Sequence, residues 1–160
     1  MVHSGDGNYR NGTFLACRIK PMNEPRRASI LVVDDETAVR ELLKLQLAGA
    51  GYDVIVADDA IVAGRSLMSA PPDLMVIDVA LPYLDGVDFV AALKADTTMP
   101  QVPVVFMSGN VEVLARARAL GAPCLKKPFS GEQLLEVVRR ELHLRPPQRR
   151  ARLDYFSAST

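Results

Sequence analysis

Polar side chains stand at the ends of four short apolar runs in this sequence. The run Leu74–Ile77 ends on Asp78, and the others end on Asp34 and Asp35, on Ser108, and shortly before Lys127. An apolar run of about four to eight residues bounded by turn residues is typical of a strand buried on both faces of a parallel sheet. The carboxyl ends of such strands share one edge of the sheet, where open α/β proteins bind ligands. We therefore expect these five side chains to meet in one pocket.

The types of these side chains suit the chemistry of a phosphoryl group and a divalent cation. Three carboxylates brought together repel one another and need a cation, and Mg²⁺ prefers oxygen ligands. Lys127 adds a charge that can pair with a carboxylate or a phosphoryl oxygen, and Ser108 adds a hydroxyl donor. A carboxylate such as that of Asp78 can attack phosphorus and form an acyl phosphate. The metal, Lys127 and Ser108 would then position and neutralise the phosphoryl oxygens during transfer.

Each of these pieces has an ordinary structural explanation when it is taken alone. Adjacent aspartates such as Asp34 and Asp35 can cap a helix, Ser108 with Gly109 is a common turn, and Lys126 with Lys127 is usually solvated charge. The functional interpretation is favoured because several independent strand ends agree on one chemistry.

The rest of the sequence alternates strands with helices, as such a pocket requires. Besides the first three runs above, strands are predicted over Val54–Ala57 and, as the fourth run, over Cys124–Leu125. Helices are predicted over Glu36–Ala48, from a cap at Asp58 to about Ser69, around Phe89–Leu93 to about Asp96, over Val113–Leu120, and from a Ser130/Gln133 capping box to Leu142. Five strands that alternate with five helices imply a parallel sheet covered on both faces.

The two ends of the chain differ from this pattern. Residues 1–28, in which Gly and Pro interrupt polar sequence, are predicted to be a partly disordered extension. The folded domain is predicted over residues 29–144, and residues 145–160 are a basic tail. We expect this tail to be solvated or to dock on a partner. A role for its arginines in binding nucleic acid, or for Tyr155 and Phe156 in anchoring a dimer, stays open.

Length and composition bound the class of protein. The 160 residues suffice for one domain with a full core. The 19 Lys and Arg residues balance 19 Asp and Glu, so no net field would steer the chain to nucleic acid or to an anionic membrane. Cys17 and Cys124 have no metal-ligand spacing, and no segment resembles a signal peptide or a membrane helix. We expect a soluble cytoplasmic protein.

Four motifs together resemble the receiver domain of two-component response regulators. They are ILVVDDE at residues 30–36, MVIDVALPYLDG at 75–86, VVFMSG at 104–109 and KKPF at 126–129. Their order and spacing suit the family, although each motif alone is weak. The resemblance implies a flavodoxin-like, doubly wound α/β fold with a five-stranded parallel sheet in the order 2-1-3-4-5 and five helices.

The resemblance also implies roles for the site residues. Asp78 would be the phosphoacceptor, and Ser108 and Lys127 would contact the phosphoryl oxygens. Mg²⁺ would be held by Asp35, Asp78 and the backbone carbonyl of Ala80, with Asp34 acting through water. The peptide between Lys127 and Pro128 would be cis.

One position departs from the family pattern. Three residues before the matching lysine, similar receivers carry a Tyr or Phe that swings inward on phosphorylation, and here that residue is Cys124. A thiol cannot replace the volume of an aromatic ring, so we expect Ser108 to act as the switch with Cys124 in an altered role. Cys124 is interpreted as a small buried hydrophobe in preference to a redox sensor.

The leading hypothesis is a single-domain response regulator that is not an enzyme beyond its own phosphorylation and dephosphorylation. It would take a phosphoryl group from a sensor histidine kinase or a phosphotransfer protein. It would then signal to a downstream protein, or as a homodimer, without direct binding to DNA or membrane. One alternative is a phosphatase of the haloacid dehalogenase-like type, which needs a second Asp where this chain has Ala80. The other is a receiver-like dimerisation scaffold that is never phosphorylated.

Overall fold

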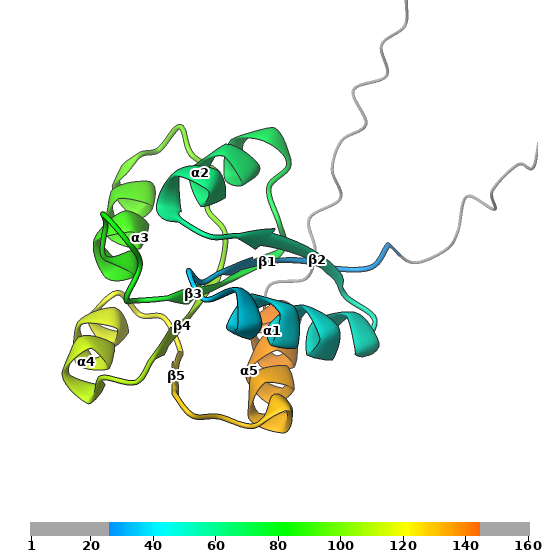
Figure 1. Ribbon diagram of the computed structural model, residues 1–160. Helices are drawn as coiled ribbons and strands as arrows, with labels where there is room; N and C mark the ends of the chain where they lie inside the picture. Colours follow the sequence, from blue (N-terminus) through cyan, green and yellow to red (C-terminus); the bar gives the residue numbers. More distant parts are fainter. Residues whose placement is uncertain (1–25, 145–160) are drawn as a thin grey trace, which may run out of the picture.

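The computed structural model describes residues 26–144, in which strands and helices alternate around one sheet (Figure 1). The elements follow in the order β1 (Ser29–Val33), α1 (Thr37–Gly49), β2 (Asp53–Ala57), α2 (Ala60–Ser69), β3 (Leu74–Asp78), α3 (Gly86–Ala95), β4 (Val104–Ser108), α4 (Val111–Ala119), β5 (Cys124–Lys126) and α5 (Gly131–Leu144). The predicted alternation of five strands with five helices is thereby confirmed.

The five strands form one parallel sheet in the order β2-β1-β3-β4-β5. This order places β1 and β3 side by side in the sheet, with Val33 paired to Ile77. On the other side of β3, Asp78 is paired with Met107 of β4. The flavodoxin-like topology predicted from the resemblance is therefore confirmed, and its central strands end next to one another.

The strands are apolar on both faces because helices cover the sheet on both sides. Alternate residues such as Ile30, Val32 and Val76 pack with α1 and α5 on one face. Their neighbours, such as Leu31 and Ile77, pack with α2, α3 and α4 on the other. All five residues of β3 and of β4 are buried. This burial explains why the strands read as continuous apolar runs.

Side-chain caps begin most of the helices. Asp59 caps α2 by accepting from the Val62 amide, so the prediction that placed this cap at Asp58 was wrong by one residue. At α5, Gln133 Oε1 accepts from the Ser130 amide and Ser130 Oγ accepts from the Gln133 amide, which confirms the capping box. Helix α1 differs, since its N-cap Glu36 makes no capping hydrogen bond through its side chain.

The described residues both begin and end at the edge of the sheet where the strands start. Each helix of this fold runs back from the edge where a strand ends to the edge where the next begins, and α5 does so last, ending at Leu144. At the other end, Arg26 donates to Asp73, which precedes β3. Residues 1–25 of the predicted extension and the basic tail at residues 145–160 lie outside the described residues. The division of the chain into three parts stays a prediction.

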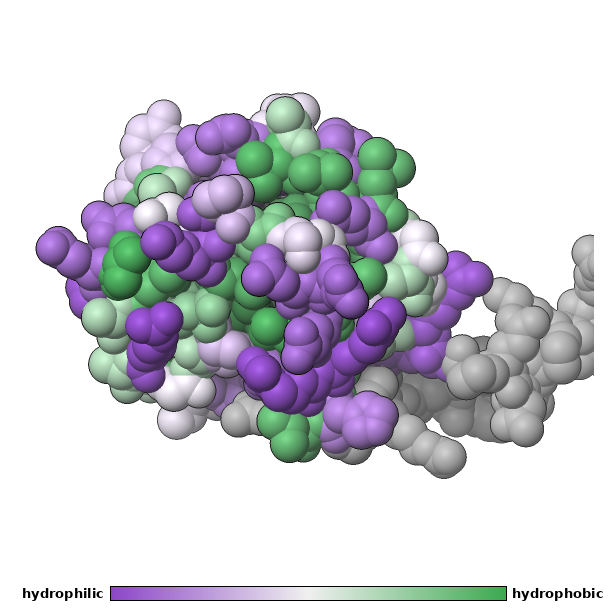
Figure 2. Space-filling model, turned by 90° about the horizontal axis from the view of Figure 1, so that it is seen from below, coloured by the Kyte–Doolittle hydropathy of each residue, from purple (hydrophilic) through white to green (hydrophobic). Residues whose placement is uncertain are grey.

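The surface of the described residues is mixed in polarity. Figure 2 shows the side where α4 and α5 lie, with hydrophilic side chains over most of it and hydrophobic ones in separate patches. Exposed apolar residues of the described chain include Leu42 and Leu45 of α1 and Leu144 at the end of α5. Within residues 26–144, no helix combines the length and the apolar character needed to cross a bilayer.

Candidate functional site

The carboxyl edge of the sheet brings together the residues predicted from the strand ends. Asp34 follows β1, and Asp78, Ser108 and Lys126 are the last residues of β3, β4 and β5. Because Val33 is paired with Ile77, Asp34 and Asp78 are each one residue beyond a paired position on neighbouring strands. Lys127 follows β5, and its amide donates to the Ser108 carbonyl at 2.9 Å. The parallel register therefore places these side chains together at the carboxyl edge of the sheet.

Lys127 lies between two buried carboxylates. Its Nζ donates to Asp34 Oδ2 at 2.8 Å and to Asp78 Oδ2. The side chains of Asp34 and Asp78 are 1 % and 10 % exposed, and that of Lys127 is 24 % exposed. Burial alone would lower the pKa of Lys127, but the hydrogen bonds and charges of Asp34 and Asp78 outweigh it and raise that pKa. The ammonium is therefore charged and held at the two acids.

Backbone amides fix the other oxygen of each carboxylate. Asp34 Oδ1 accepts from the Glu36 amide at 2.9 Å, and Asp78 Oδ1 accepts from the Ala80 amide at 2.9 Å. Each acid thus folds the residues that follow it into a tight turn. As a result, both carboxylates have defined orientations at the sheet edge.

Ser108 contributes a buried hydroxyl from the neighbouring strand. It is 5 % exposed, and its Oγ accepts from the Asn110 amide at 3.1 Å. Asn110 in turn caps α4 through its side chain. The hydroxyl is therefore tied to the start of α4, and within residues 26–144 no hydrogen bond donated by its proton is found.

The remaining predicted ligands, Asp35 and Ala80, lie at the exposed rim of the site. In the described part of the chain, no group of three or more His, Cys, Asp or Glu side chains is arranged to hold a metal ion. The donor set nevertheless suits Mg²⁺ chemically, because two buried carboxylates share only one ammonium and a third acid is adjacent in sequence. The residues present therefore fit a cation bound at the rim, beside Lys127.

Cys124 occupies the place where similar receivers carry an aromatic ring. It was interpreted as a small buried hydrophobe, and the structure places it partly buried at the start of β5, opposite Phe106. Its Sγ lies 3.6 Å from the carbonyl oxygens of Leu114 and Ala122. Burial raises the pKa of this thiol, and Arg118 opposes the rise only in part. A thiol kept protonated in this way suits packing better than redox chemistry.

Three residues that sequence analysis missed shape this site. Arg40 donates to the backbone carbonyls of Asp34 and Asp35. A Cβ on Gly86 would come within 2.3 Å of the Asp78 carbonyl oxygen. Arg116 of α4 bonds Asp85 and Asp88 at the start of α3. Only Gly86 had a signal, since Asp85 and Gly86 form a turn after Pro82.

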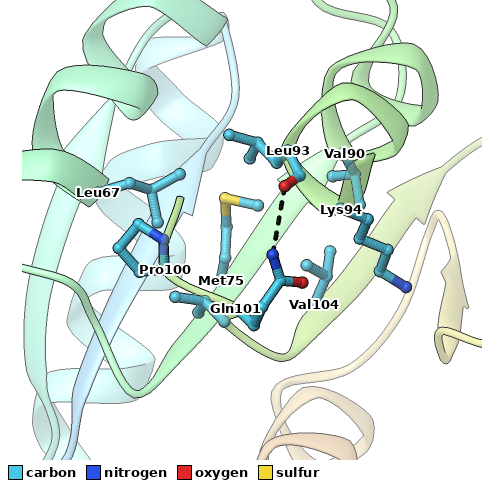
Figure 3. Close-up of a pocket in the computed structure, with 9 residues that line it drawn as sticks. Leu67, Met75, Val90, Leu93, Lys94, Pro100, Gln101 and Val104 are labelled. Atoms are coloured by element: carbon cyan, nitrogen blue, oxygen red, sulfur yellow. Dashed lines mark hydrogen bonds between the residues drawn. The ribbon is translucent and has the colours of Figure 1, made fainter. Parts of the chain in front are cut away.

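Two further features concern the backbone and the surroundings of the site. The peptide between Lys127 and Pro128 is cis, as the resemblance implied. A small open pocket lies away from the acidic residues, between α2, α3 and the start of β4 (Figure 3). Gln101 Nε2 donates to the Leu93 carbonyl across it, and none of the predicted site residues lines it.

Comparisons with known proteins agree with this geometry. Residues 30–139 match the family of response regulator receiver domains. The DNA-binding response regulator MtrA of Mycolicibacterium paratuberculosis is 33 % identical over 116 residues, which cover 72 % of this chain and 52 % of MtrA. Response regulator MprA of Mycobacterium avium is 37 % identical over 122 residues, which cover 74 % of this chain and 53 % of MprA. The chain thus spans about half the length of these curated relatives.

A solved structure shows the same architecture. The chemotaxis response regulator CheY4 of Vibrio cholerae aligns with a TM-score of 0.67 at 31 % identity, covering 73 % of this chain and all of CheY4. The family match over residues 30–139 contains the acidic residues, the hydroxyl and the lysine.

Proposed function

Because the chain belongs to the family of response regulator receiver domains, we propose that Asp78 accepts a phosphoryl group from a phosphohistidine and that the domain then signals through protein contacts. The phosphohistidine would belong to a sensor histidine kinase or a phosphotransfer protein. The observation that carries this proposal is the contact of one ammonium, Lys127 Nζ, with the buried carboxylates of Asp34 and Asp78.

In the proposed reaction, a carboxylate oxygen of Asp78 attacks phosphorus in line with the leaving imidazole. The P–N bond of the phosphohistidine breaks, its electron pair returns to the imidazole, and an acyl phosphate forms on Asp78. Lys127 can keep its bond to Asp34 while its contact with Asp78 Oδ2 passes to a phosphoryl oxygen. Its raised pKa keeps it charged for this role.

Ser108 and the acidic rim supply the remaining contacts. The Ser108 hydroxyl would donate to a phosphoryl oxygen, which couples phosphorylation to the start of α4 through Asn110. Asp34, Asp35, Asp78 and the carbonyl of Ala80 are proposed to hold Mg²⁺, which when bound neutralises charge on the phosphoryl oxygens.

The output of the domain is proposed to be contact with another protein, either a downstream target or a second copy of this chain, in the cytoplasm. MtrA is a DNA-binding response regulator, so the expectation that this chain does not bind DNA directly needs its own test. Mobility-shift assays with the full chain, with and without a phosphodonor, would measure DNA binding. Binding of DNA that increases on phosphorylation would replace our proposal that the output is contact with another protein.

Phosphorylation itself can be tested with a small-molecule phosphodonor. Incubation of the full chain with acetyl phosphate and Mg²⁺ should add one phosphoryl group by intact mass, and hydroxylamine should remove it. Asp78→Asn should abolish the addition. Asp53→Asn should not, because Asp53 is an exposed acid at the opposite edge, at the start of β2. Failure of the wild-type chain to gain mass would refute the proposal.

The wild-type chain and Asp78→Asn also distinguish the two alternative functions from the proposed one. A phosphatase would release phosphate from monoesters over many turnovers, but the position that would need its general acid is Ala80, whose amide is bonded to Asp78. A scaffold that is never phosphorylated would bind its partner equally well with Asp78→Asn.

A further inference from the structure

Arg40 of α1 reaches back to the turn that carries both acids of the first strand end. Its Nη1 donates to the backbone carbonyl of Asp34 at 2.6 Å and to that of Asp35 at 2.9 Å. Its Nη2 donates to Thr37 Oγ1 at 3.1 Å. The ion pairs of the described residues include none between Arg40 and a carboxylate. Arg40 therefore binds the backbone of the acidic turn and makes no bond to the carboxylate oxygens of Asp34 or Asp35.

This contact matters because few side chains hold the acidic turn, whose backbone is also bonded through the Asp34 amide to the Ala57 carbonyl at 3.2 Å. Glu36, the N-cap of α1, makes no side-chain capping bond, and Asp35 is exposed. The other side-chain contacts that fix the turn are those of Asp34, whose carboxylate binds the Glu36 amide and Lys127. One nitrogen of the planar guanidinium binds both carbonyls while the other binds Thr37 Oγ1, so Arg40 fixes the two carbonyls relative to the first turn of α1.

We propose that Arg40 is a positioning residue for the acidic pair, holding the backbone of Asp34 and Asp35 so that their carboxylates face a common cation. This inference rests on the proposed function, in which those carboxylates bind Mg²⁺. Arg40 touches neither the phosphoryl group nor the metal in this proposal and acts only through the turn.

A positioning role and a purely electrostatic role predict opposite effects of removing Arg40 on the affinity for Mg²⁺. The loss of a nearby positive charge would by itself strengthen the binding of a cation. The loss of a group that orients the ligands would weaken it. The sign of the change in Mg²⁺ affinity therefore identifies which role Arg40 has.

The experiment compares Arg40→Ala and Arg40→Lys with the control Arg65→Ala in the full chain. Arg65 is an exposed arginine of α2 whose side chain makes no hydrogen bond or ion pair with another described residue. Calorimetric titration with Mg²⁺ should show affinity weakened about 10-fold or more by Arg40→Ala, as is typical when an outer partner of a metal site is lost. Arg40→Lys should give an intermediate loss, and Arg65→Ala should bind like the wild type.

A second measurement needs no metal. The Glu36 amide is bonded to Asp34 Oδ1, so its hydrogen exchange in metal-free protein reports on the order of the turn. Exchange at Glu36 should accelerate in Arg40→Ala and stay unchanged in Arg65→Ala. A thermal melt of each variant shows whether it is folded, and Arg40→Lys carries the test if Arg40→Ala is not.

The outcomes separate this inference from the proposed function. Tighter or unchanged Mg²⁺ binding in Arg40→Ala, with unchanged exchange at Glu36, would overturn the positioning role and leave phosphorylation at Asp78 standing. A wild-type chain that binds no Mg²⁺ would count against the proposed metal site, and exchange at Glu36 would then decide the role of Arg40 alone.

Discussion

Lys127 is the residue on which the electrostatics of the site depend. Two carboxylates that are almost fully buried stay in proximity because one ammonium is bonded to both. Without that charge, burial would make two neighbouring negative groups costly. The lysine therefore stabilises the unphosphorylated site as well as serving the proposed transfer.

Replacing Lys127 with Met should lower the free energy of unfolding by about 2 kcal/mol, less than for a fully buried pair because the ammonium is partly exposed. The pKa of Lys127 is raised above its ordinary value of 10.5. Its stabilising effect should thus be complete below that pH and decline as the pH rises through the higher folded pKa. Urea unfolding at neutral pH and above pH 10.5 measures both effects.

The neighbouring Lys126→Met is the matched control, because Lys126 is exposed at the end of β5. It should leave stability nearly unchanged at every pH. Equal effects of the two substitutions would contradict the special role of Lys127.

Gly86 constrains the backbone of Asp78, the proposed phosphoacceptor. A methyl group there would meet the Asp78 carbonyl oxygen at 2.3 Å, and a backbone atom cannot easily give way. Gly86→Ala should therefore destabilise the fold by about 1–3 kcal/mol and slow phosphorylation by acetyl phosphate. Gly49→Ala, at the end of α1 with open space around it, should do neither. Unfolding curves and intact-mass time courses provide the comparison.

At the scale of elements, both ends of α3 are connected to the C-terminal part of α4. Arg116 of α4 bonds Asp88 at 2.7 Å and Asp85 at 3.4 Å near the start of α3. Lys94, in the last turn of α3, donates to the Leu120 carbonyl just past α4 at 2.7 Å. Since α3 follows Asp78 and α4 follows Ser108, these contacts couple the two helices that leave the site.

Arg116→Ala should loosen α4 without unfolding the domain. Arg116 is 52 % exposed, so its ion pairs should contribute less than about 1 kcal/mol to global stability. Amide exchange across α4 should nevertheless become faster, because local opening costs less than global unfolding. Arg118→Ala is the control on the same helix, since the side chain of Arg118 makes no hydrogen bond or ion pair with another described residue. Equal amide exchange across α4 in the two variants would show that the contacts of Arg116 with α3 do not stabilise α4.

Phosphorylation should reorganise the side of the sheet formed by β4, α4 and β5. Ser108 ends β4, the Lys127 amide is bonded to its carbonyl, and Cys124 of β5 contacts Leu114 of α4 through sulfur. Beryllofluoride, a phosphoryl mimic, should therefore change amide exchange over these elements and leave β2 and α2 unchanged. Identical exchange with and without the mimic would contradict this prediction.

Most elements were predictable because their signals are local. Apolar runs marked the strands, and the Ser130 and Gln133 pair marked α5 through a cap that is read directly from spacing. The cap of α2 was misplaced because Asp58 and Asp59 are both good caps, and only the packing of Ala60 and Ala63 against the sheet decides between them.

At the scale of the whole molecule, the convergence of Asp34, Asp78 and Lys127 was predictable because parallel strands end at a common edge. The roles of Arg40 and Arg116 were not, since each depends on the direction in which a long side chain leaves its helix. The conformation of Tyr83 could not be predicted either. This residue is 98 % exposed and has a φ of 67°, a left-handed conformation that an aromatic residue seldom adopts. Nothing in its sequence neighbourhood signals that geometry.

The edge at which the described residues begin and end has a practical consequence. Arg26 and Leu144 both lie where the strands start, and the acids and Lys127 lie where the strands end. A label or tether attached at Arg26 or Leu144 would thus approach the domain from the edge opposite Asp78. Attachment at these two residues is suited to immobilising the chain without obstructing Asp34, Asp78 or Lys127.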